Sequence, residues 1–110
     1  MQDLMAHTDP KLAVLIASIV AALSPEAIYL FGSRTKGAQR ADSDYDLLVV
    51  VPDESPSERL APSRTYDLAR AVHVPADIVA CRKSSFERWR DEVGTLSYEA
   101  SRHGRRIYGR

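Results

Sequence analysis

The chain has 110 residues, 45% of them hydrophobic, and a formal net charge of zero. This length fits one domain, which we expect to span residues 1–110, and the balanced charge argues against general nucleic-acid binding. The longest apolar run, residues 12–23, is too short for a membrane span, and the first residues lack the basic start of a secretion signal. The single cysteine, Cys81, excludes an internal disulfide. We therefore expect a soluble, cytoplasmic protein.

Local signals predict helices and strands in alternation along the chain. Asp9-Pro10 is typical of a helix start, because the acid can cap the helix and proline fits its first position. Apolar residues then recur at helical spacing, whereas the runs around Leu30 and Val49 are short and rich in β-branched or aromatic residues, as in strands. Ser55 and Ser84 each stand three residues before a glutamate, which is the spacing of a capping box. The predicted elements are helix 10–23, strand 27–31, helical turn 34–36, strand 45–51, helix 62–73, strand 76–81, a helix from 84 to 90 or beyond, helix 95–103 and strand 106–108.

This order of elements indicates an α/β (α+β) fold, in which helices pack on a small mixed β-sheet. The link between the first two strands has only about a dozen residues, which is short for a crossover helix. We therefore expect those two strands to be antiparallel.

A pair of aspartates opens the second strand. Asp44 and Asp46 are two residues apart, so they project to the same face and Tyr45 projects to the other. Adjacent carboxylates repel each other unless a cation lies between them, and Mg²⁺ prefers such oxygen ligands. Asp77 opens the third strand and could reach the same site, which would give three carboxylates for two metal ions. The alternative is that Asp44 and Asp46 are strand-end acids in water and that Asp77 is a turn residue.

The turn after the first strand suits a phosphate group. Gly32 lets the backbone approach a ligand, and the short helix predicted to begin here would favour an anion at its N-terminus. The Ser33 hydroxyl adds a donor, and Arg34, Lys36 or Arg40 could neutralise phosphate charge. Ser33 could also simply cap that helix.

Together these residues resemble the signature of the DNA polymerase beta-like nucleotidyltransferase superfamily, and most closely its small minimal nucleotidyltransferases. Their motif is Gly-Ser, a glycine a few residues later and then Asp-x-Asp, with a third acid on a later strand. The corresponding residues here are Gly32-Ser33, Gly37, Asp44-Tyr45-Asp46 and Asp77. The motif covers about residues 28–51, and the rest of the chain matches in length and order of elements.

The resemblance implies a polymerase beta-like fold that binds a magnesium-bound nucleoside triphosphate and transfers a nucleoside monophosphate, AMP from ATP, to a hydroxyl group. Many such proteins are antitoxins paired with an all-helical toxin of the higher-eukaryote-and-prokaryote nucleotide-binding (HEPN) type, and some place AMP on a tyrosine of that partner. The implied catalytic metal ligands are Asp44, Asp46 and Asp77, and the implied nucleotide-binding residues are Gly32, Ser33, Arg34 and Gly37. Two alternatives stay open, namely a module that neutralises a helical toxin by contact alone and a regulator that binds the triphosphate without transferring it.

Overall fold

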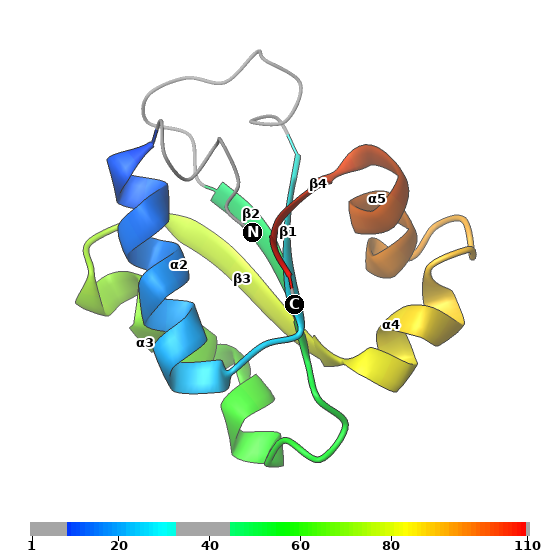
Figure 1. Cartoon of the computed structure of the whole chain (residues 1–110), viewed down its shortest axis with the longest axis horizontal. Coiled ribbons are helices and arrows are strands. Elements are labelled where there is room, and N and C mark those ends of the chain that lie inside the picture. Colours follow the sequence, from blue (N-terminus) through cyan, green and yellow to red (C-terminus); the bar gives the residue numbers. More distant parts are fainter. Residues whose placement is uncertain (1–8, 33–44, 110) are drawn as a thin grey trace.

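The computed structural model describes residues 9–32 and 45–109, which fold around a four-stranded sheet (Figure 1). The elements in chain order are α2 (Pro10–Leu23), β1 (Ala27–Phe31), β2 (Tyr45–Val51), the 3-10 helix η2 (Ser57–Leu60), α3 (Pro62–Ala71), β3 (Ala76–Arg82), α4 (Lys83–Trp89), α5 (Leu96–His103) and β4 (Arg105–Gly109). The predicted fold class, a small mixed sheet with helices packed on it, is confirmed. No helix within these two ranges is long and apolar enough to cross a membrane.

The strand order across the sheet is β3-β2-β1-β4. β1 pairs antiparallel with β2 on one side, as the short link predicts, and antiparallel with β4 on the other. β2 pairs parallel with β3, and α3 lies in the connection between them. Parallel neighbours need a crossover of this kind, because the chain must return to the same end of the sheet.

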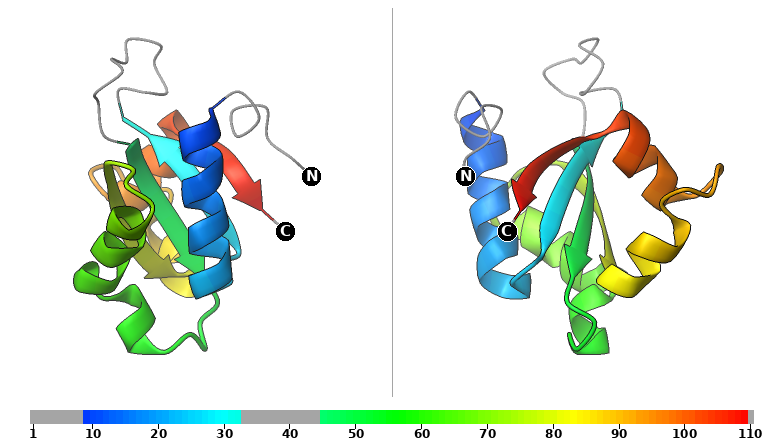
Figure 2. Two further views of the ribbon diagram at one scale, coloured as in Figure 1. Left: turned by 90° about the vertical axis from the view of Figure 1, so that its left-hand side faces the viewer. Right: turned by 45° about the vertical axis from the view of Figure 1, so that its right-hand side comes forward.

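Helices cover both faces of the sheet (Figure 2): α2 and α3 lie on one face, and α4 and α5 lie on the other. Along β2, Leu47, Val49 and Val51 pack in the core under α2 and α3. Leu48 and Val50 alternate with them and pack with Phe86 and Ala100 under α4 and α5. Burial on both faces explains why β2 is a continuous apolar run and shows no alternation of polar and apolar residues.

The helix starts only partly follow the sequence signals. Asp9 caps α2 as predicted, since its side chain accepts a hydrogen bond from the Leu12 N–H at 3.2 Å. The two capping boxes predicted at Ser55 and Ser84 are wrong, because η2 and α4 have no side-chain cap of this kind and α4 begins earlier, at Lys83. The Ser84 N–H instead donates to Asp53 Oδ1 at 2.9 Å. A loop residue 31 positions away therefore satisfies a backbone group in the first turn of α4.

Candidate active site at the start of two parallel strands

Two acids of the predicted site lie side by side at the start of neighbouring strands. Asp46 is the second residue of β2 and Asp77 is the second residue of β3, and the parallel register pairs them directly. Paired residues of adjacent strands project to the same face, and the strands lie about 4.8 Å apart. Asp77 is exposed and Asp46 is partly exposed. A ligand from solvent can therefore reach both carboxylates.

The acid pair occupies an uncovered part of the sheet face that carries α4 and α5. Leu48 follows Asp46 on this face of β2 and is buried by those helices. Val79 follows Asp77 on the same face of β3, yet 40% of its surface is exposed. A valine in mid-strand is normally covered by the next layer of a fold. Its exposure shows that α4 and α5 leave the sheet open beside Asp77.

Gly32 directly follows β1 and lies beside Asp46. Its φ angle is +83°, in the left-handed region that favours glycine. A Cβ atom added at Gly32 would overlap the Oδ2 atom of Asp46. The preceding residue, Phe31, is the register partner of Asp46 on β1. The absence of a side chain at Gly32 thus makes room for the carboxylate, and the predicted turn begins where the acid pair lies.

The other predicted site residues lie outside the described residues, and so does the helical turn predicted over 34–36. These site residues are Ser33, Arg34, Gly37 and Asp44. The predicted pairing of Asp44 with Asp46 therefore stays a prediction. Within residues 9–32 and 45–109, no group of three or more His, Cys, Asp or Glu residues could hold a metal ion. The described carboxylates nonetheless fit Mg²⁺, which favours oxygen ligands and often takes only one or two from the protein.

One contact near the site has no counterpart in the sequence signals. The Tyr45 hydroxyl donates a hydrogen bond to Asp9 Oδ2, which joins the start of β2 to the cap of α2. The Tyr45 ring is 3% exposed and packs in the core under α2 and α3, so it projects away from the acid pair, as the alternation of a strand predicts. The two residues are 36 positions apart, and no local pattern predicts such a pair.

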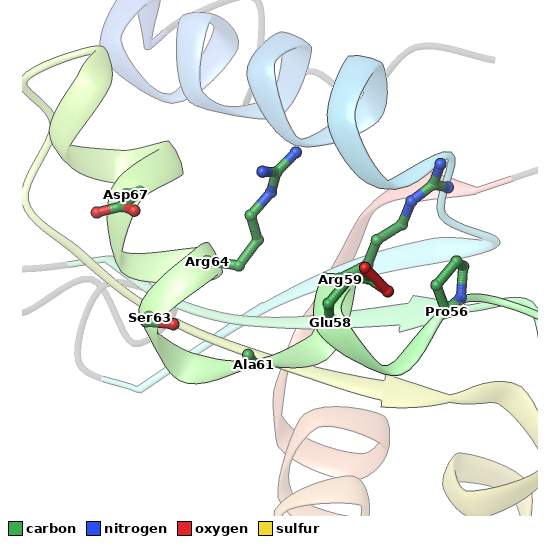
Figure 3. A pocket seen from close by; sticks show the side chains of 7 residues that line it. All are labelled: Pro56, Glu58, Arg59, Ala61, Ser63, Arg64 and Asp67. Carbon is green, nitrogen blue, oxygen red and sulfur yellow. The ribbon is translucent and has the colours of Figure 1, made fainter.

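A hollow of about 540 Å³ lies elsewhere, on η2 and α3 (Figure 3). Its lining is Pro56, Glu58, Arg59, Ala61, Ser63, Arg64 and Asp67. Acidic and basic side chains are mixed there, and none of the predicted site residues contributes to it. The acid pair is the better candidate for metal chemistry, since Mg²⁺ takes carboxylate oxygens and the two arginines of the hollow would repel a cation.

The partly buried setting of Cys81 favours a packing role over a nucleophilic one. Its side chain packs beside the cluster of Phe86 and Leu48, and burial raises the pKa of the thiol to about 11. Thiols react as thiolates, and a thiol with so high a pKa stays protonated at neutral pH. This agrees with the sequence, in which Cys81 stands in an apolar strand.

The sequence model of the family described as "Polymerase beta, Nucleotidyltransferase" matches residues 15–110. The chain belongs to this nucleotidyltransferase family. The predicted resemblance is thereby confirmed at the level of the family and its fold. A search of curated proteins finds no match.

Solved structures with the same fold include members of toxin–antitoxin pairs. One is a crystal structure of a toxin–antitoxin with AMP-PNP, 25% identical with a TM-score of 0.56, over 87% of this chain and 72% of that one. A second, from Shewanella oneidensis, is a tri-AMPylated HEPN toxin in complex with MNT antitoxin, 22% identical with a TM-score of 0.50, over 92% and 69%. A third is a Sulfolobus solfataricus protein described provisionally as a nucleotidyltransferase, 17% identical with a TM-score of 0.56, over 96% and 88%. At these identities, the last two show the fold alone.

Proposed function

We propose that this chain is a Mg²⁺-dependent nucleotidyltransferase that moves AMP from ATP onto a protein hydroxyl, a tyrosine of a HEPN-type toxin, and so acts as an antitoxin. The observation that carries the proposal is the direct pairing of Asp46 with Asp77, beside Gly32, on an open part of the sheet. Family membership supports nucleotidyl transfer. One toxin–antitoxin structure is described with AMP-PNP, which supports ATP as the donor. The other is described with an AMPylated HEPN toxin, which supports a toxin as the acceptor.

Each site residue has an assigned role. Asp44, Asp46 and Asp77 would hold Mg²⁺ in a two-metal site, and the metal would neutralise the triphosphate and lower the barrier to attack by the acceptor oxygen. The acceptor oxygen bonds to the α-phosphorus while the bond to pyrophosphate breaks, and Asp77 helps by taking the hydroxyl proton.

The remaining predicted residues bind the donor. Gly32, Ser33, Arg34 and Gly37 hold the β- and γ-phosphates, through backbone N–H groups, a hydroxyl and a guanidinium. Residues 1–110 act as one catalytic domain in the cytoplasm, and the partner presents the acceptor. Exposed Val79 beside Asp77 leaves space on the sheet for that approach.

The test is transfer of label from α-labelled ATP to a co-expressed HEPN-type protein in the presence of Mg²⁺. We expect an AMP-sized mass gain on a tyrosine of the partner, and a loss of at least about 100-fold in rate for Asp46→Asn, because a metal ligand is replaced by a neutral group. Asp67→Asn is the matched control, since Asp67 is an exposed acid on α3, the helix over the other face of the sheet. It should transfer AMP at the wild-type rate.

Two outcomes would contradict the proposal. Full transfer by Asp46→Asn would remove the acid pair from the chemistry. Neutralisation of the toxin by a folded Asp46→Asn variant that adds no AMP would favour an antitoxin that acts by contact alone.

A further inference from the structure

Strand β2 carries Asp46 at its second position, and its first residue, Tyr45, is bonded on two sides. The Tyr45 backbone N–H donates to the Pro75 carbonyl oxygen at 3.1 Å. Pro75 stands two residues before Asp77, so this bond joins the starts of the two strands that carry the acid pair. The Tyr45 hydroxyl donates to Asp9 on the other face of the sheet.

Asp9 uses both oxygens of its carboxylate. Oδ1 accepts from the Leu12 N–H and caps α2, whereas Oδ2 accepts from the Tyr45 hydroxyl. Hydrogen bonds to a charged acceptor are stronger than neutral ones. A single carboxylate therefore fixes the start of α2 against the start of β2.

This bond has a direct consequence for Asp46. Successive residues of a strand point to opposite faces, so a Tyr45 ring anchored in the core under α2 and α3 keeps Asp46 on the open face. Terminal residues of a strand fray unless they are held by further contacts. The bonds of Tyr45 to Pro75 and Asp9 supply those contacts one residue before Asp46.

We propose that Tyr45 and Asp9 are positioning residues for the metal site, and that their hydrogen bond holds Asp46 in register with Asp77 for binding of a divalent cation. The inference rests on the proposed function, since it assumes that Asp46 and Asp77 bind the metal. Neither side chain touches substrate in this scheme. They act through the backbone of β2, in the way that outer-sphere groups orient metal ligands.

Two substitutions separate this role from general stability. Tyr45→Phe keeps the buried ring and removes the hydroxyl. Asp9→Ser keeps an N-cap acceptor for α2, because serine caps about as well as aspartate, but its side chain is too short to bond Tyr45 as well. Tyr66→Phe is the matched control, because the Tyr66 side chain lies on α3 and is 61% exposed.

The measurement is Mn²⁺ affinity by isothermal titration calorimetry, with Mn²⁺ as a stand-in for Mg²⁺ because both ions take carboxylate and water oxygens as ligands. We expect Tyr45→Phe and Asp9→Ser each to weaken Mn²⁺ binding about tenfold. The double variant should lose no more than either single variant, because both remove the same bond. Labelled AMP transfer should return to near the wild-type rate at saturating Mn²⁺, which a loss of folded protein would not allow.

The outcomes are distinguishable. Wild-type Mn²⁺ affinity in both single variants would overturn the positioning role and leave the proposed function intact. The same conclusion would follow if the double variant lost the sum of the two single losses in Mn²⁺ binding free energy. A wild-type protein and Tyr66→Phe control that bind no Mn²⁺ would overturn the proposed function, and the positioning role with it.

Discussion

Gly32 shows how a single residue can serve two requirements. Its backbone adopts a φ of +83°, and its missing side chain leaves space for the Asp46 carboxylate. The sequence predicts only the first kind of role, a glycine where the backbone turns and approaches a ligand. The second requirement depends on the β1–β2 register, which sets Phe31 opposite Asp46.

Gly32→Ala should therefore lose both stability and metal affinity. Gly94→Ala is a matched control, because Gly94 also has a positive φ, +95°, but nothing lies within 4 Å of an added Cβ. We expect both variants to lose on the order of 1 kcal/mol in the free energy of unfolding, from backbone strain. Only Gly32→Ala should also weaken Mn²⁺ binding, because its Cβ displaces Asp46. Equal Mn²⁺ affinities for the two variants, measured by calorimetry, would show that displacing the Asp46 carboxylate does not weaken metal binding.

At the scale of elements, the helices and strands are largely predictable, with both ends exact for α2, β1 and β2 and shifted by one or two residues in the later elements. Periodic apolar residues and proline signals act within one segment, so the range predicted for β2 is confirmed. The two Ser-x-x-Glu spacings predict capping boxes that do not form, because so short a spacing also occurs by chance. The group that supports α4 is Asp53, on the loop after β2, and the parallel pairing of β2 with β3 places that loop beside α4.

Asp53→Ala should destabilise the fold through α4. The Ser84 N–H would lose its carboxylate acceptor, and such a loss at a helix start costs about 1 kcal/mol. The measurement is the free energy of unfolding from urea titration, followed by circular dichroism. Glu54→Ala is the control, because Glu54 is the exposed neighbour in the same loop. An equal effect of both substitutions would mean that the Asp53 cap contributes nothing.

At the scale of the whole molecule, contacts between residues far apart in the sequence could not be predicted from local patterns. The acids at 46 and 77 were both candidates, but their direct pairing depends on a parallel register across α3 that no local pattern specifies. The Tyr45–Asp9 bond was missed for the same reason, since it spans 36 positions and two elements. The order of elements came from local signals, whereas the geometry of the site came from the assembled sheet.

The partly buried Cys81 thiol makes the stability of the whole fold depend on pH. Burial raises its pKa from 9.0 to about 11, so the folded state holds the proton where the unfolded chain has begun to release it. The contribution is complete below pH 9 and is lost as the pH rises from about 9 to about 11. We expect wild type to lose on the order of 1 kcal/mol more than Cys81→Ala between pH 8 and pH 10, in urea titrations. Parallel pH profiles would show that the thiol ionises equally in both states.

The position of β4 beside β1 has a consequence for how the molecule is made. β1 spans Ala27–Phe31, whereas the strand that completes its outer side spans Arg105–Gly109. A ribosome releases the chain from its N-terminus, so one edge of β1 stays open until residues 105–109 have left the exit tunnel. Until then, the nascent sheet presents unpaired backbone groups that another chain can capture, and the pairing of β4 with β1 removes them.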